Sequence, residues 1–243
     1  MSNNYSPDAF QQPDPRTSGA ALPVKALIFD FDGLILDTES ADVHAWQNIY
    51  AEHGVQFPID SWGQIIGGTG ASQFDAAIHL QSLLGHPLDL EALQTQQNHI
   101  SHSLVAQENV LPGILDYLQE AKRHHLQLAI ASSSPHSWVD SHAKRLGIFD
   151  YFDKIICADD VAAGRTKPNP DLFLLALRQL QARNHEAIVF EDSPNGVKAA
   201  KSAGIFVVAV PNPVTSLLSI EDADLTLSSL TDLSLHELLN KVK

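Results

Sequence analysis

The sequence predicts an α/β protein built on a parallel sheet, with a helical insertion in its first connection. Short runs of almost wholly apolar residues alternate with helical patterns, and about a hundred residues separate the first apolar run from the second. Such runs are typical of strands covered on both faces, and their alternation with helices implies parallel pairing. Because ordinary crossovers are several times shorter, the first connection must hold an insertion. The expected architecture is a Rossmann-like core with an inserted α-helical cap domain.

Each core element is predicted from its own pattern. The strands are expected at residues 24–29, 126–131, 154–158, 187–190 and 205–210, with a further strand near 225–227. The helices are expected at residues 113–124, 136–146, 170–183, 195–203 and 232–242. Pro135 and Pro194 stand at first-turn positions, and Gly147 and Gly204 stand at helix ends, which supports these boundaries.

The chain divides into three regions. Residues 1–22 are rich in Asn, Gln, Ser and Pro without periodicity and lack a secretory-signal pattern, so we expect a disordered tail. Residues 23–37 and 111–243 are assigned to the α/β core domain. Residues 38–110 are assigned to the cap domain, because they hold three helical patterns and no convincing strand. These patterns run from about 39 to 53, 70 to 84 and 89 to 107.

Composition narrows the class of protein. The chain has 243 residues, 15 Lys and Arg against 29 Asp and Glu, and a single cysteine, Cys157. The formal net charge of −14 argues against nucleic-acid binding, and the lone cysteine excludes a disulfide framework. No apolar run approaches the roughly 20 residues of a membrane span. We therefore expect a cytoplasmic protein, monomeric by default, with no nucleic-acid or membrane partner.

Polar residues follow the predicted strands where they end. The first strand is followed by Asp30-Phe-Asp-Gly33, the second by Ser132-Ser-Ser134 and the fourth by Glu191-Asp192, while Lys167 lies downstream of the third. Because the carboxyl ends of parallel strands meet at one edge of a sheet, we expect these groups in one crevice. Carboxylates gathered together repel one another and need a cation, and oxygen ligands favour Mg²⁺.

This set of side chains suits phosphoryl transfer. A metal-held aspartate can attack phosphorus, and a second aspartate two residues on projects to the same side of an extended strand, where it can act as general acid and base. A serine hydroxyl and a lysine ammonium can hold the remaining phosphoryl oxygens. Gly33 lets the backbone turn away with its N–H facing the phosphate.

Four motifs, in order, resemble those of the haloacid dehalogenase-like (HAD) superfamily. They are Asp30-Phe-Asp-Gly-Leu-Ile-Leu-Asp-Thr38, Ala131-Ser-Ser-Ser134, Lys167-Pro-Asn-Pro-Asp171 and Glu191-Asp-Ser-Pro-Asn-Gly196. The sequence is most similar to the β-phosphoglucomutase-like phosphatase branch, which carries a helical cap after the first strand. The resemblance covers roughly residues 24–212.

The resemblance implies a role for each residue. Asp30 would be the nucleophile and an Mg²⁺ ligand, and Asp32 the general acid/base, whose backbone carbonyl also binds the metal. Asp192 would be the acidic metal ligand, with Glu191 beside it as a further ligand or a support, and Asn195 as a support. The phosphate would be bound by Ser132, Ser133, Lys167 and Gly33. The insertion would be a mobile cap that closes over the substrate.

The activity implied is that of an Mg²⁺-dependent phosphatase, which hydrolyses a small sugar, polyol or similar metabolite phosphate through an aspartyl-phosphate. The alternatives are a sugar-phosphate mutase of the β-phosphoglucomutase type and a non-catalytic regulatory binding module. Asp42 stands where the mutases carry a histidine, which argues against the first. Asp32 argues against a dehalogenase, and the lysine-free cap argues against a phosphonatase.

The negative charge is concentrated in the insertion. Residues 37–110 carry nine acids and six of the 12 histidines but no Lys or Arg. We therefore expect the cap to favour leaving groups that are neutral or cationic over those with a second anionic group.

Some residues of the insertion allow two interpretations. Gly67-Gly-Thr-Gly70 is either a helix-entry turn or a substrate-specificity loop. His99 and His102 are three apart on one predicted helix, where they are either solvated residues or a shared ligand pair. Trp46, Trp62 and Phe74 are expected to pack inside the cap, where one of them can instead stack on a substrate ring.

Overall fold

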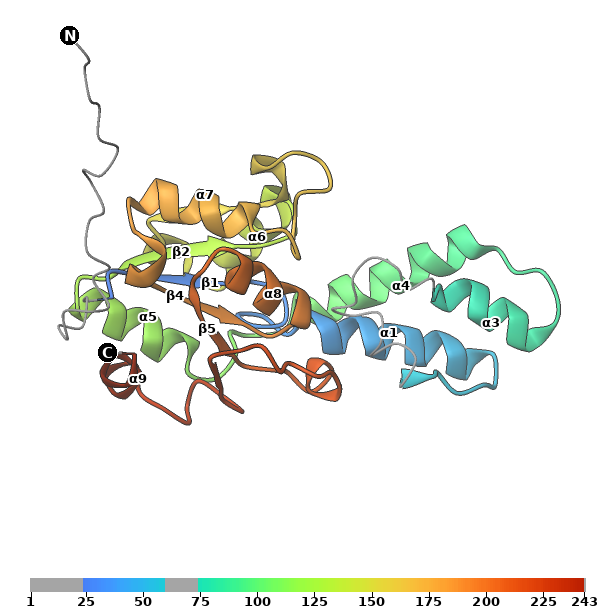
Figure 1. Cartoon of the computed structure of the whole chain (residues 1–243). Coiled ribbons are helices and arrows are strands. Elements are labelled where there is room, and N and C mark those ends of the chain that lie inside the picture. Colours follow the sequence, from blue (N-terminus) through green and yellow to red (C-terminus); the bar gives the residue numbers. More distant parts are fainter. Residues whose placement is uncertain (1–23, 60–73, 243) are drawn as a thin grey trace, which may run out of the picture.

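The computed structural model describes residues 24–59 and 74–242. In this part of the chain, six parallel strands form one sheet in the order β3-β2-β1-β4-β5-β6. The strands are β1 (Ala26–Phe29), β2 (Gln127–Ala131), β3 (Lys154–Ile156), β4 (Ala187–Glu191), β5 (Phe206–Ala209) and β6 (Leu225–Thr226). The predicted parallel α/β fold is confirmed (Figure 1).

The strand order reverses at the centre of the sheet. β1 pairs with β2 on one side and with β4 on the other, and Phe29 lies opposite both Ile130 and Phe190. In open parallel sheets, ligands bind beyond the carboxyl ends of the strands at such a reversal. The pairing therefore brings Asp30 level with Glu191 at this point.

Helices cover both faces of the sheet (Figure 1). One face is covered by α5 (Ile114–Arg123), α6 (His136–Arg145) and α9 (Leu235–Lys241), and the other by α7 (Asp171–Leu180) and α8 (Pro194–Ser202). Successive strand residues point to opposite faces, so Leu27 and Phe29 pack with the first group, and Ala26 and Ile28 with the second. This two-sided burial explains why the strands are apolar throughout.

Local hydrogen bonds set the element ends. α8 begins as predicted at the Ser-Pro step, where the Ser193 hydroxyl accepts from the N–H of Gly196 at 3.1 Å and Pro194 has no N–H that would need an acceptor. The third strand is shorter than predicted and ends at Ile156. The reason is that the next N–H, that of Cys157, donates to the Asp160 carboxylate at 2.8 Å and starts a 3₁₀ turn.

Three helices of the described chain lie between β1 and β2, namely α1 (Thr38–Glu52), α3 (Ala76–Leu84) and α4 (Leu90–Val105). They share a hydrophobic cluster of their own that includes Trp46, Tyr50 and Leu80, and α1 packs along α4. The Tyr50 hydroxyl donates to the carbonyl of Ala76 at 2.7 Å, which ties α1 to α3. These helices extend away from the sheet (Figure 1).

Trp46 and Phe74 belong to the cluster of the inserted helices, as expected. The expectations for the 1–22 tail, for Gly67–Gly70 and for Trp62 concern residues outside the described part. Within that part, no helix combines the length and the apolar character needed to cross a membrane.

The aromatic stack beneath the ends of β1 and β4 makes a testable contribution to stability. Phe190 stacks on Phe29 with ring centroids 4.7 Å apart and meets Tyr117 edge-on at 5.5 Å. Phe190→Ala should lower the free energy of unfolding by about 3–5 kcal/mol, because a buried ring is replaced by a cavity. Urea unfolding measures this. Leu217→Ala, at a side chain that is 56% exposed, is the control and should change it by less than about 0.5 kcal/mol.

Candidate active site

Three carboxylates meet beyond the ends of β1 and β4. Asp30, Glu191 and Asp192 are all buried, and one oxygen from each lies within 4.8 Å of the others. The Asp30 N–H donates to the carbonyl of Phe190 at 3.0 Å, which continues the strand pairing into the site. The sheet register therefore brings together acids that are about 160 residues apart in the sequence.

Lys167 supplies positive charge to this group of acids. Its ammonium contacts Asp30 and lies 2.5 Å from the Oε1 of Glu191, and its side chain is only 6% exposed. The ammonium lies over the ring of Phe173 on α7, 5.2 Å from the ring centroid. The preceding loop is held by Arg165, whose guanidinium makes a two-bond contact with Asp171. The loop after β3 thus carries a cation to the ends of β1 and β4.

One lysine does not balance three buried carboxylates. The pKa of Asp30 is raised to about 7, first by burial and then by the charge of Glu191, against the opposing effect of Lys167. Burial also raises the pKa of Asp192, and Asp30 and Glu191 raise it further. For Lys167, burial lowers the pKa, but the charges of Asp30 and Glu191 raise it by more, so the ammonium stays charged. A divalent cation would favour the ionised carboxylates.

The donor set fits a hard divalent cation such as Mg²⁺. The group offers only oxygen ligands, and Asp30 and Asp192 contribute carboxylates from adjacent strands. Glu191 is differently placed, since its Oε1 faces Lys167 while its Oε2 accepts from the Ser193 hydroxyl at 3.2 Å. This arrangement favours the interpretation of Glu191 as a support for Lys167.

Asn212 is a site residue that the sequence analysis missed. Its amide nitrogen donates to Asp192 Oδ2 at 2.8 Å and to the Gly33 carbonyl at 3.2 Å. Its amide oxygen accepts from the N–H groups of Val214 and Thr215, both at 2.9 Å, so the side chain is held in one orientation. The available signal was its position, because Asn212 follows β5 as the other site residues follow their strands.

Two glycines allow close approach of the backbone to the acids. Gly33 has φ +81°, and a Cβ there would lie 2.2 Å from Asp192 Oδ2, so a side chain at this position would collide with the carboxylate. At Gly196, in the first turn of α8, a Cβ would lie 1.8 Å from the carboxyl carbon of Glu191. The Asp-x-Asp-Gly and Glu-Asp-x-x-x-Gly spacings therefore have a steric reason.

Asp32 faces a different set of partners from Asp30. Its Oδ2 accepts from the hydroxyls of Ser134 at 2.7 Å and Ser132 at 3.2 Å, and its Oδ1 accepts from the indole N–H of Trp138 at 2.7 Å. Ser132 is buried, and Ser133 is exposed at the end of β2. Ser134 and Trp138 could not be identified from the sequence as partners of Asp32, because their contacts depend on how α6 follows β2.

Asn195, the remaining residue that is predicted to support the site, lies close to Glu191 and Asp192 in the sequence. Asn195 occupies the first turn of α8 and is half-buried, between Ser193, which contacts Glu191, and Gly196, which packs on it. Of the predicted site residues, Asp30, Lys167, Glu191, Asp192 and Gly33 are thus in mutual contact or close approach, and Asp32 with Ser132 forms a second group.

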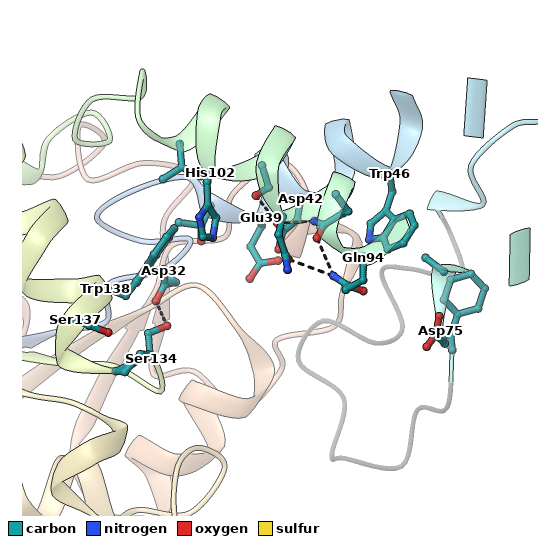
Figure 2. A pocket seen from close by; sticks show the side chains of 18 residues that line it. Asp32, Glu39, Asp42, Trp46, Asp75, Gln94, His102, Ser134, Ser137 and Trp138 are labelled. Carbon is teal, nitrogen blue, oxygen red and sulfur yellow. Dashed lines mark hydrogen bonds between the residues drawn. The ribbon is translucent and has the colours of Figure 1, made fainter. Parts of the chain in front are cut away.

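A cavity of about 740 Å³ lies between the sheet end and the inserted helices (Figure 2). Its core side includes Asp32, Ser134 and Trp138. The side formed by α1 and α4 is polar and is lined by Glu39, Asp42, Gln94, Gln97, Asn98, Ser101 and His102. The cavity therefore presents hydrogen-bonding groups of the insertion opposite the core carboxylate Asp32.

The polar groups of the insertion are tied to one another. Asp42 Oδ1 accepts from the hydroxyl of Ser101 at 2.5 Å and from the amide of Gln97 at 3.0 Å. Gln94 donates to Gln97 Oε1 at 3.0 Å (Figure 2). The pKa of Glu39 is raised to about 8, by burial first and then by the charges of Asp42 and the core acids. This wall of the cavity holds acids and amides, and none of its lining residues is Lys or Arg.

Comparison with known families gives a match over most of the chain. The family model described as Haloacid dehalogenase-like hydrolase matches residues 27–210. The chain is 43% identical over 217 residues to the protein of Bacillus subtilis (strain 168) that bears the name "Putative phosphatase YhcW", covering 89% of this chain and 97% of that protein. It is 31% identical over 208 residues to validoxylamine A 7'-phosphate phosphatase of Streptomyces hygroscopicus subsp. limoneus, covering 86% and 95%.

Solved structures share the fold along nearly their whole length. CbbY from Rhodobacter sphaeroides in complex with phosphate has a TM-score of 0.66 at 29% identity, covering 88% of this chain and 99% of that chain. A mutant of the same protein in complex with xylulose-(1,5)bisphosphate has a TM-score of 0.65 at 28% identity, with the same coverage.

The charge imbalance of the carboxylates makes a prediction about metal and stability. Folding raises the pKa of the Asp192 carboxyl. Ionisation of this carboxyl therefore lowers the free energy of unfolding at pH values above its pKa in the unfolded chain. Asp192→Asn should therefore be at least as heat-stable as the unaltered protein at pH 8 without metal. The unaltered protein should gain about 5–10 °C in Tm when Mg²⁺ reaches about 100 times its Kd, and the variant should gain nothing.

Differential scanning fluorimetry with and without Mg²⁺, after treatment with a chelator, measures both effects. Asp116→Asn removes the same charge from an exposed position on α5 and should keep the full Mg²⁺ shift. An Mg²⁺ shift of equal size in Asp192→Asn would contradict the assignment of Asp192 as a metal ligand.

Proposed function

This chain belongs to the haloacid dehalogenase-like hydrolases, in their β-phosphoglucomutase-like branch, and we propose that it is an Mg²⁺-dependent phosphatase with an aspartyl-phosphate intermediate. The names of its curated relatives support the class of phosphoric monoester hydrolase. The observation that carries the proposal is the contact of Lys167 with Asp30 beside Asp192, while Asp32, two residues after Asp30, lines the cavity. Nucleophile, cation and acid are thus carried by neighbouring residues at one end of the sheet.

In the first step, a carboxylate oxygen of Asp30 attacks phosphorus, and the bond from phosphorus to the ester oxygen breaks. Asp32 gives its proton to the departing oxygen, which leaves as an alcohol. Lys167 and the Ser132 hydroxyl hold the phosphoryl oxygens as charge develops on them. When held by Asp30, Asp192 and the backbone carbonyl of Asp32, Mg²⁺ would cancel the repulsion between the two anions.

In the second step, water attacks the phosphorus of the aspartyl-phosphate. Asp32, now ionised, takes a proton from this water, and the bond between phosphorus and the Asp30 oxygen breaks to release phosphate. Glu191 keeps Lys167 in place throughout, since Glu191 Oε1 lies 2.5 Å from its ammonium. The same acid therefore serves both steps, and Asp30 is regenerated.

The residues that line the cavity favour a leaving group that is rich in hydroxyls and carries no second phosphate. The cavity wall on the insertion includes acids and amides that accept and donate hydrogen bonds, and Asp42 Oδ1 already accepts from Gln97 and Ser101. A second phosphate dianion would meet Asp42 without a lysine or arginine on the insertion to balance it. Sugar, polyol and amino-polyol phosphates satisfy these conditions.

We extend the proposal to the organisation of the protein. Residues 38–110 would act as the cap domain over a core of residues 23–37 and 111–243. The hydrophobic cluster around Trp46 supports this division, because the inserted helices bury apolar side chains among themselves. A cytoplasmic monomer that acts on a small metabolite fits the lone, buried thiol of Cys157.

Asp30→Asn tests the reaction itself. This variant should lose Mg²⁺-dependent hydrolysis across a panel of phosphomonoesters, because the amide cannot attack phosphorus. Release of inorganic phosphate measures activity, and circular dichroism checks that the fold is kept. Retained Mg²⁺-dependent turnover would refute the aspartyl-phosphate mechanism. With β-glucose 1-phosphate in the panel, free sugar and phosphate support the phosphatase, whereas glucose 6-phosphate would support the mutase.

A matched pair of substrates tests the choice of leaving group. We expect kcat/KM to be at least about tenfold higher for fructose 1-phosphate than for fructose 1,6-bisphosphate. Asp42→Asn should reduce the ratio of the two kcat/KM values about fivefold. The reason is that the repulsion between two unit charges about 4 Å apart in water is worth about 1 kcal/mol. Glu91→Gln removes a charge from the same insertion outside the cavity and should leave the ratio unchanged. A preference for the bisphosphate in the unaltered protein would overturn this expectation.

A further inference from the structure

Trp138 occupies an unusual position beside Asp32. It is the third residue of α6, which starts just after the serines that follow β2, and it lines the same cavity as Asp32 (Figure 2). Its indole N–H donates to Asp32 Oδ1 at 2.7 Å. An indole nitrogen can only donate, so this bond holds Oδ1 as an acceptor in both protonation states of Asp32.

The other oxygen of Asp32 has partners of a different kind. Oδ2 accepts from the hydroxyls of Ser134 at 2.7 Å and Ser132 at 3.2 Å. A hydroxyl can rotate and become the acceptor, so these bonds tolerate a proton on Oδ2. The indole can only donate to Oδ1, whereas the two serine hydroxyls can either donate to Oδ2 or accept from it. This difference selects Oδ2 as the oxygen that carries the proton.

The indole ring is held from two sides. The His142 ring, one turn further along α6, lies 4.3 Å from it between centroids, and the His102 ring of α4 lies 5.0 Å from it. α6 is joined to the end of α4 a second time through Arg145, which donates to the carbonyls of Glu108 at 2.8 Å and Val105 at 3.1 Å. The orientation of the indole therefore depends on both the core and the insertion.

We propose that Trp138 is a positioning residue for the general acid/base, which fixes the rotamer of Asp32 and directs the proton to its Oδ2. The proposal rests on the function proposed above, in which Asp32 protonates the leaving oxygen. It adds that the N–H donor comes from α6. The indole ring of this donor contacts α4 of the insertion, while its N–H contacts Asp32. Removal of this N–H should impair protonation of the leaving group and leave the attack by Asp30 unaffected.

Trp138→Phe tests this, because it keeps an aromatic ring and removes only the N–H donor. We compare kcat/KM, which reports the steps up to release of the leaving group, for fructose 1-phosphate and for p-nitrophenyl phosphate. The sugar alkoxide must be protonated as it leaves, whereas p-nitrophenolate needs little assistance. The variant should lose about tenfold or more on the sugar phosphate and less than about threefold on the aryl phosphate.

Trp46→Phe is the matched control, because it removes an indole N–H from the same cavity without touching Asp32 (Figure 2). It should not reproduce the selective loss on the sugar phosphate, because Trp46 makes no contact with the acid that protonates the leaving oxygen. Leu217→Ala, at an exposed side chain outside the cavity, is a second control and should leave kcat/KM for both esters unchanged. Hydrolysis of p-nitrophenyl phosphate by Trp138→Phe also shows that the variant is folded. Equal losses on both esters, or no loss on either, would overturn the positioning role. An unaltered protein that releases no phosphate from these two esters or from the panel of phosphomonoesters would refute the proposed function instead.

Discussion

The contact of Lys167 with Asp30 and Glu191 is the interaction on which the rest of the site depends. Three buried carboxylates would not share one site without positive charge, and Lys167 brings that charge to them on a side chain that is 6% exposed. The remaining imbalance, visible in the raised pKa of Asp30 and Asp192, is what makes the group suited to a divalent cation. A divalent cation held by these carboxylates would reduce the repulsion among them.

The sheet makes this grouping possible. Asp30 and Glu191 follow two strands that pair in register, and the stacked rings of Phe29 and Phe190 lie directly before them in the chain. Gly33 and Gly196 then let the neighbouring backbone approach the acids more closely than any side chain would permit. The stability of the core and the geometry of the site are therefore two consequences of the same strand pairing.

The inserted helices and the core contribute different properties to the cavity. The core supplies Asp32, Ser134 and Trp138, whereas α1 and α4 supply acids and amides but no Lys or Arg. The two meet at Trp138, whose ring contacts His102 of α4 and whose N–H contacts Asp32. The part of the protein that we expect to choose the leaving group thus touches the residue that we expect to protonate it.

Much of this protein could be read from its sequence, because strands and helices leave local patterns. The apolar runs indicated the strands, the long first connection indicated the inserted helices, and the polar residues after each strand indicated Asp30, Asp32, Lys167 and Asp192 as candidates. Only the tertiary structure decided the contacts between elements that are distant in the chain. The contact of Trp138 with Asp32 and the turn of Glu191 toward Lys167 have no local signal, and the position of Asn212 after β5 does not indicate its contact with Asp192. They depend on side-chain direction and on how helices pack after their strands, which residue spacing does not encode.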